Sequence, residues 1–321
     1  MDALKSSLVL SFLLALRPLA HSSFAAGLTP SRFATSLSLQ IPTVSSLDLK
    51  NPVLDPDFPT GNPLPSQDET LEEMAGLKLL KASKTQEARL KEVIALARRT
   101  PTGREVVRKI KKLSSQAGNF PVVFSSLGRN LGQYDYASQT LELDRKFLHE
   151  DIRLSVSTLI HEMTHILQHS QNVPAESLEM ELEAYLVHIK TLRELKMPVK
   201  DWEPFSQQAF KLIKSDPQKY IDWMAEQHPG KFLLKNGNAE ELAEFQEQEL
   251  ERQDKLINNL NQKIEESPQN TALRKKKKRA KIILSWIERD IALLRSRKGV
   301  ARYRQFSKRV DSLLRRLSDR L

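Results

Sequence analysis

The sequence contains no cysteine in its 321 residues. This absence excludes a disulfide framework, a cysteine-ligated zinc finger, an iron–sulfur cluster and a thiol nucleophile. Any metal site must therefore use histidine, aspartate or glutamate. The chain does have enough hydrophobic residues for a core, at 40%, and its 28% of charged residues indicates long solvated helices.

Long hydrophobic runs are also lacking. The most apolar segment, residues 8–16, is nine residues long, whereas a helix needs about 20 to span a bilayer. Lys5 precedes this segment, and small residues that could form a cleavage site follow it at Ala25 and Ala26. Residues 1–26 are therefore predicted to be a cleaved signal peptide, which implies an exported (periplasmic or secreted) protein without an integral membrane segment after cleavage.

The excess of positive charge lies at one end of the chain. The whole sequence has a net charge of +10, but residues 271–321 contain 18 Lys and Arg against 4 Asp and Glu, and the preceding 270 residues have a net charge of −4. The chain is therefore a mildly acidic body followed by a basic tail. The excess of base does not by itself indicate that the body acts on an anionic polymer.

Composition and hydrophobic periodicity divide the chain further. Residues 27–68 are rich in Ser, Thr and Pro and are predicted to be an extended or propeptide-like linker. Residues 69–235 are predicted to form the main domain, and residues 236–321 a basic helical extension that contains a hairpin or coiled coil. The expected fold class is α+β and mostly helical, with a short β-sheet beside a central helix.

Within the main domain, the period of the apolar residues changes along the chain. Apolar residues between Leu71 and Leu80 recur at helical spacing, so one helix is expected across this segment. Residues 120–124 and 140–143 are predicted to be two strands joined by a loop. Two further helices are expected to end near residues 97 and 118. Others are expected over residues 151–168, 175–195, 203–214, 217–227 and 239–266. A helix or helix pair is expected over residues 271–321.

The residues that carry chemistry lie in the predicted helix at 151–168. His161, Glu162 and His165 form an HExxH motif. Positions i and i+4 share one face of a helix, so both imidazoles can bind one Zn²⁺ at about 2.0–2.1 Å. Glu162 lies beside such a metal and is the candidate general base and later proton donor.

A catalytic zinc usually has three protein ligands, and the next predicted helix offers several glutamates. The segments LIHEMTHILQH and ELEAY resemble the gluzincin-type (HExxH…ExxA) bacterial zinc metallopeptidases. The resemblance covers roughly residues 100–200 and implies a zincin-like fold, hydrolysis of peptide bonds, and Glu181 as third ligand. It also implies that Ala184 lets the two helices approach. Glu183 is the alternate third ligand, and Glu179 is a weaker one.

The resemblance extends to the elements around the metal. In zincins an edge strand holds the peptide substrate by backbone pairing, and residues 139–143 are similar to that strand. Where the family often has an acid that orients a zinc-bound histidine, this chain has Tyr185. Tyr185 and His188 could each donate a hydrogen bond to an oxyanion, with ordinary packing as the alternative. His169, one helical turn beyond the motif, is expected to be a helix-end histidine.

The predicted function is that of an exported zinc metallopeptidase acting on a peptide or protein substrate. Two alternatives stay open. One is a catalytically inactive zincin-like binding module, and the other is a helical envelope or anionic-polymer-binding protein with an incidental HExxH motif. The basic run Arg274–Arg279 is either a solvated helix face or a contact for an anionic surface or polymer.

Overall fold

The computed structural model describes residues 69–128, 130–234 and 237–320. Helices account for 71% of it, and the strands form one small mixed sheet. This confirms the predicted α+β, mostly helical class. The predicted signal peptide and linker, residues 1–26 and 27–68, lie outside the described residues. Within the described ranges, no helix is long and apolar enough to cross a membrane.

The first elements differ from the single helix that the sequence predicts there. Helix α2 (Leu71–Ala75) ends at Gly76, whose φ of 68° is left-handed, and strand β1 (Leu77–Leu79) follows. A Cβ on Gly76 would lie 2.1 Å from Ser114 Oγ in helix α4 (Pro101–Ala117), so glycine permits both the turn and this close approach. Strand pairing therefore overrides the local helical spacing, and the prediction is wrong.

The sheet has four strands in the order β1-β2-β4-β3. Strand β2 (Phe120–Ser125) pairs in parallel with β1 and with β4 (Thr140–Asp144), whereas β3 (Gly132–Asp135) pairs antiparallel with β4. The sequence predicts a loop at β3, but the chain folds back there through a turn in which Gln139 has a φ of 52°. The edge strand is therefore β3, and residues 139–143, predicted as the edge, lie between two strands.

Two long helices occupy the centre of the fold. Helix α5 (Ile152–Ser170) packs against α6 (Leu178–Glu194), and it also contacts α3 (Lys84–Ala97), α4 and β3. Most of α5 is buried, because the sheet and the other helices surround it. Beyond α6, a shared hydrophobic core continues into α7 (Pro204–Ser215) and α8 (Pro217–Gln227).

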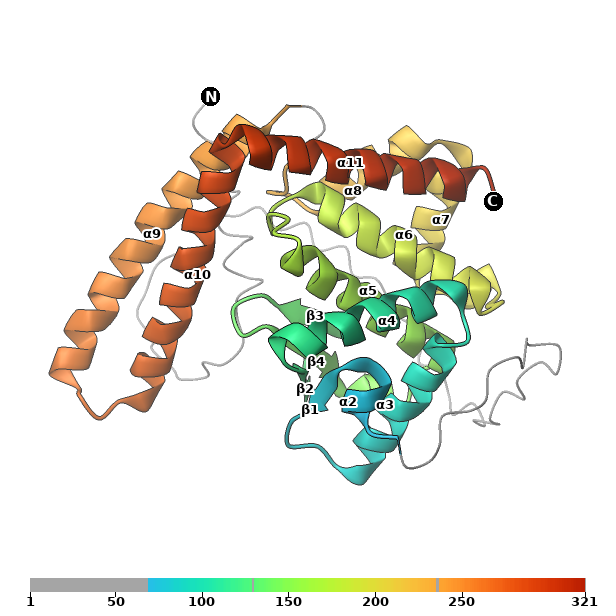
Figure 1. The fold of residues 1–321 in the computed structure, drawn as a ribbon, viewed down its shortest axis with the longest axis horizontal. Helices are drawn as coiled ribbons and strands as arrows, with labels where there is room; N and C mark the ends of the chain where they lie inside the picture. The colour runs from blue at the N-terminus through green and yellow to red at the C-terminus, as the bar shows by residue number, and fades with distance from the viewer. Residues whose placement is uncertain (1–68, 129, 235–236, 321) are drawn as a thin grey trace, which may run out of the picture. The chain divides into compact units, whose positions relative to one another are not determined.

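The basic C-terminal segment forms three helices. Helices α9 (Ala239–Glu266) and α10 (Thr271–Arg295) form the predicted hairpin and run side by side (Figure 1). Helix α11 (Arg297–Ser318) turns back and packs against α6, α7 and α8. Its inner face contributes Phe306, Val310, Leu314 and Leu317 to the core that includes α6. One face of α11 is therefore buried in the hydrophobic core.

The hairpin also contacts the sheet. Arg279 of α10 forms two hydrogen bonds, of 2.9 and 3.0 Å, with the carboxylate of Asp135 at the end of β3. Trp286, two turns further along α10, packs its ring against Tyr136 and His169. These contacts place helix α10 at the end of the edge strand.

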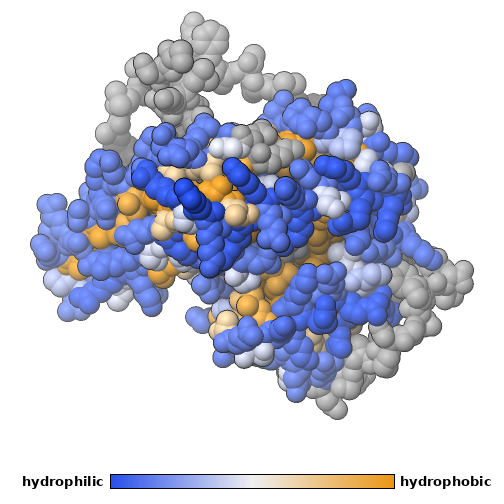
Figure 2. Space-filling view, turned by 45° about the horizontal axis from the view of Figure 1, so that its top comes forward, coloured by the Kyte–Doolittle hydropathy of each residue, from blue (hydrophilic) through white to orange (hydrophobic). Residues whose placement is uncertain are grey.

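The surface seen in Figure 2 is mostly hydrophilic, with hydrophobic residues in patches between the hydrophilic ones.

Candidate metal centre

Helix α5 brings two imidazoles together on one face. His161 and His165 are buried, and their Nε2 atoms lie 3.1 Å apart. Glu181 in α6 directs its Oε2 atom at both, 3.7 Å from His165 Nε2 and 4.0 Å from His161 Nε2. Their ligand atoms all lie within 4.8 Å of one another, as one metal ion requires. The structure thus brings together the two predicted ligands and the third that the resemblance implies.

The three donor atoms suit zinc. Tetrahedral ligands at 2.0–2.1 Å from zinc lie about 3.4 Å from one another, and the donor separations here range from 3.1 to 4.0 Å. Two imidazoles and one glutamate are also a common donor set of hydrolytic zinc sites. Burial lowers the pKa of both His161 and His165, so the imidazoles are neutral and keep lone pairs for a metal.

Lys231 contacts the other carboxylate oxygen of Glu181, the third candidate ligand. Its Nζ lies 3.1 Å from Glu181 Oε1 and donates to the Ala175 carbonyl at 2.8 Å. Burial raises the pKa of Glu181, but the charge of Lys231 and the nearby histidines outweigh burial and hold that pKa well below its usual range. Glu181 is therefore ionised, with one oxygen on a cation and the other facing the imidazoles. No spacing rule in the sequence identifies Lys231.

Glu162 lies between the imidazole pair and β3. Its carboxylate accepts a hydrogen bond from the Tyr134 backbone N–H, and burial raises the pKa of this carboxyl to about 8. Gly132 allows the strand to come this close, since a Cβ there would lie 3.0 Å from Glu162 Cγ and 3.1 Å from Thr158 Cγ2. A carboxyl with such a pKa can exchange a proton near neutral pH, as a general base must.

The outer edge of β3 faces this glutamate. Asp144 donates its backbone N–H to the Leu131 carbonyl on the β3 side. Because hydrogen-bonded and non-bonded positions alternate along an antiparallel pair, Gly132 and Tyr134 turn their backbone groups away from β4. The Tyr134 N–H accordingly reaches Glu162. An extended peptide could pair with this edge beside the candidate base.

The other two candidate glutamates of α6 have different partners. Glu183 accepts a hydrogen bond from Gln168 Nε2 at 2.9 Å and forms an ion pair with Arg309 Nη2 of α11 at 3.0 Å. Glu179 is buried and accepts a hydrogen bond from Ser307 Oγ of α11 at 2.9 Å. Both carboxylates join α6 to α11, so the geometry favours Glu181 as the third ligand.

Both candidate oxyanion donors pack near the His161 ring. Tyr185 packs its ring against His161, with centroids 4.6 Å apart, and burial raises the pKa of its hydroxyl. His188 Nε2 lies 3.0 Å from Glu203 Oε1 and 3.1 Å from Ser206 Oγ. Burial raises the pKa of Glu203, but His188 and the hydrogen bonds bring it down to about 2. His188 is thus held by Glu203 and Ser206, and Tyr185 packs on the His161 ring.

His228 also lies near the candidate metal centre, although the sequence gives no signal for it. Its ring centroid lies 6.2 Å from that of Tyr185, and it is among the groups that influence the pKa of Glu181 and His161. Its Nε2 atom is buried without a hydrogen-bond partner among the described residues. Buried polar atoms rarely lack a partner, so this nitrogen is suited to meet a substrate or water.

His169 takes no part in the group of donor atoms. Its Nδ1 is hydrogen-bonded to the Tyr134 hydroxyl at 2.9 Å, and its ring packs against Trp286. It lies near the end of α5, as the sequence predicts. His169 therefore connects α5 with the edge strand β3 and with α10.

No family model matches the chain, and no match was found among curated proteins or solved structures. The class of site is therefore defined by its own geometry: a buried group of two histidines and one glutamate, with a second glutamate at the free edge of a β-sheet.

Proposed function

We propose that the chain is an exported zinc metallopeptidase that hydrolyses peptide bonds in a peptide or protein substrate. The observation that carries this proposal is the position of Glu162. This carboxylate lies next to the His161, His165 and Glu181 group and is hydrogen-bonded to the free edge of β3. A peptide paired with that edge would pass beside both the candidate base and the metal ligands. Export rests on the apolar N-terminal segment in residues 1–26.

Each part of the reaction has a candidate residue. Zinc, when held by the three ligands, supplies a Lewis acid that polarises the peptide carbonyl and acidifies water. Glu162 takes a proton from the attacking water and later delivers it to the leaving amine. His228 donates a hydrogen bond to the carbonyl oxygen as negative charge develops there. The outward backbone groups of Gly132 and the Tyr134 carbonyl hold the peptide in an extended form, while the Tyr134 N–H stays on Glu162.

Metal content and cleavage of an unfolded protein such as casein test this function. Wild type should hold about one zinc per chain and cleave the substrate. Glu162→Gln should keep the zinc and lose cleavage by roughly 10²-fold or more, since it removes the proton acceptor. The control Glu226→Gln, at an exposed position in α8, should change neither.

Two results distinguish the alternatives. A double variant, His161→Ala/His165→Ala, should lose both zinc and cleavage. If wild type binds zinc but does not cleave the substrate, a non-catalytic binding module is the better description. If cleavage occurs but does not depend on Glu162, the catalytic role of Glu162 fails. If wild type binds no zinc, the metal-dependent functions both fail.

We also propose that the start of α10 contacts an anionic surface or polymer. Lys275, Lys276 and Lys278 are exposed, and no ion pair joins them to a carboxylate in the described part of the chain. Such a run of unpaired cations attracts lipid headgroups or polyanions in a salt-sensitive way.

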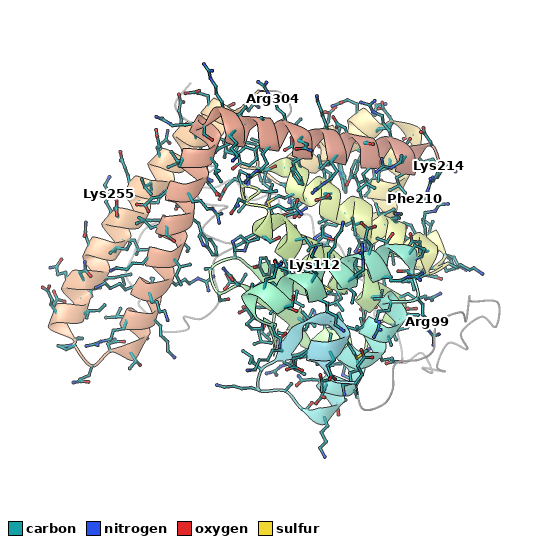
Figure 3. All side chains as sticks on the ribbon, viewed as in Figure 1. Arg99, Lys112, Phe210, Lys214, Lys255 and Arg304 are labelled. Carbon is teal, nitrogen blue, oxygen red and sulfur yellow. The ribbon has the colours of Figure 1, made fainter. Side chains whose placement is uncertain are left out.

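Vesicles of phosphatidylglycerol test this contact. Lys275→Gln/Lys276→Gln should bind them more weakly than wild type at low salt. The control Lys112→Gln/Lys214→Gln removes the same charge from two exposed positions elsewhere, labelled in Figure 3. Equal binding by the two double variants, or binding that salt does not weaken, would contradict a specific contact at α10.

A further inference from the structure

A chain of hydrogen bonds leads from the metal ligand His165 to the C-terminal helix α11. His165 Nδ1 lies 2.8 Å from Gln168 Oε1. Gln168 Nε2 donates to Glu183 Oε2 at 2.9 Å, and Arg309 of α11 contacts both oxygens of Glu183 at 3.0 and 3.1 Å. From the sequence alone, Glu183 is an alternate candidate ligand and Arg309 is one residue of the basic tail.

The partners of Gln168 fix which way its amide points. Its Nε2 lies within hydrogen-bond distance of the Met180 backbone carbonyl, at 3.0 Å, and of the Glu183 carboxylate. Both are acceptors only, so the NH₂ group of Gln168 must face them. The carbonyl oxygen of Gln168 is then the atom that faces His165. Gln168 is 1% exposed, so water does not compete for these positions.

This orientation determines where His165 carries its proton. A carbonyl oxygen can only accept, so Nδ1 of His165 must be the donor. In a neutral imidazole the other nitrogen, Nε2, then holds the lone pair. Nε2 is the atom that faces His161 and Glu181. Gln168 therefore holds His165 in the tautomer that a metal ligand requires.

Arg309 stabilises the acceptor at the far end of the chain. Nη2 of the guanidinium contacts both oxygens of Glu183 and so holds this carboxylate in place. A further hydrogen bond of 2.9 Å to Gln171 Oε1 and a contact of 4.8 Å with the Phe306 ring hold the arginine itself. Its side chain is 46% exposed while that of Glu183 is 12% exposed, so Arg309 acts at the surface on a largely buried group.

We propose that Gln168, Glu183 and Arg309 are positioning residues that fix the tautomer and orientation of His165, so that the basic helix α11 is part of the metal centre. The effect on zinc affinity rests on the metal binding in the proposed function. The effect on the tautomer concerns the metal-free protein and stands apart from it. None of the three residues touches the donor atoms directly, and each acts through the next one.

The tautomer is measured by long-range ¹H–¹⁵N correlation of the histidine side chains in the metal-free, full chain. Wild-type His165 should carry its proton on Nδ1. In Gln168→Ala it should become a mixture of the two tautomers, while thermal unfolding shows that the fold is kept. A wild-type His165 protonated on Nε2, or a tautomer unchanged by Gln168→Ala, would overturn the role of Gln168.

Zinc affinity, measured by competition with a chromophoric chelator, tests the outer part of the chain. Gln168→Ala should weaken zinc binding by about 10- to 100-fold, as the loss of such outer contacts usually does. Arg309→Gln should weaken it by about two- to five-fold at low salt, because its ion pair is partly exposed and screened. Arg309→Lys should recover part of the loss, since lysine keeps the charge but not the paired geometry.

Arg304→Gln is the matched control. Arg304 lies exposed on the same helix and is labelled in Figure 3. It should leave both the tautomer and the zinc affinity at the wild-type level. If Arg309→Gln behaves like Arg304→Gln at low salt, α11 has no part in the metal centre. If wild type binds no zinc at all, the proposed function fails, and the tautomer measurement still decides the role of Gln168.

Discussion

Replacing Gly132 with alanine tests whether the edge strand must touch the helix that carries the candidate metal centre. The added methyl group would lie 3.0 Å from Glu162 Cγ and 3.1 Å from Thr158 Cγ2, against ordinary contacts of 3.4–4 Å. Neither neighbour moves freely. Thr158 is β-branched on a rigid helix, and the Glu162 carboxylate is hydrogen-bonded to the Tyr134 N–H. The strand or the glutamate must therefore shift by a few tenths of an ångström.

The size of the effect follows from two opposing contributions. Overpacking a tight contact costs about 1–3 kcal/mol. Replacing glycine with alanine also lowers the conformational entropy of the unfolded chain, which stabilises the folded state by about 0.4–1 kcal/mol. The net loss in the free energy of unfolding for Gly132→Ala should therefore lie between about 0 and 2.6 kcal/mol, with a midpoint of about 1.3 kcal/mol, measured by urea denaturation. Cleavage should fall further than stability explains, because the displaced atom belongs to the candidate general base.

A double-mutant cycle with Thr158→Ala isolates the contact. Thr158→Ala removes the Cγ2 atom, so Gly132→Ala should cost less in that background than in wild type. The coupling should be at least about 0.5 kcal/mol, the lower end for residues in contact. A Gly132→Ala variant that is as stable and as active as wild type would refute the close approach of β3 to α5.

Three further predictions concern other parts of the molecule. His228→Ala should keep zinc but lower kcat by about 10²-fold, as loss of one oxyanion donor does; equal turnover would exclude that role. Burial raises the pKa of Asp290 to about 7 despite its bond to Arg289. Unfolded aspartate ionises near pH 3.9, so wild type should lose stability relative to Asp290→Asn as pH rises from about 4 to about 7, and parallel stability curves would contradict this. Trp202→Ala should lose about 3–5 kcal/mol of stability in denaturation, because a buried side chain hydrogen-bonded to the Met197 carbonyl is removed, while zinc affinity at low temperature stays unchanged.

The helices that carry the site could be predicted closely. The sequence places a helix at 151–168 and another at 175–195, and the structure has α5 at Ile152–Ser170 and α6 at Leu178–Glu194. Local signals are sufficient here, because apolar spacing and capping residues act within one helix. The pairing of His161 with His165 follows from the same helical spacing.

The strands are less predictable, because their partners are distant in sequence. Leu77–Leu79 has helical spacing in the sequence but pairs with β2, more than forty positions further along. Residues 132–135 are short and polar and still form the edge strand, since β4 and α5 offer them partners on two sides. Pairing of this kind depends on packing between elements, and hydrophobic period alone does not specify it.

The sequence by itself determined the chemistry that this protein can use. Without cysteine, a metal site requires histidine and carboxylate, and the HExxH spacing places two imidazoles and a glutamate on one helix. Only the tertiary structure decided which residues complete the centre. The three candidate glutamates lie within one turn and a half of α6. The angle at which α6 packs on α5 turns Glu181 toward the histidines. Glu179 and Glu183 instead form contacts with α11. Lys231, His228 and Arg309 come from remote segments, because contacts between separate elements are fixed by packing and not by spacing along the chain.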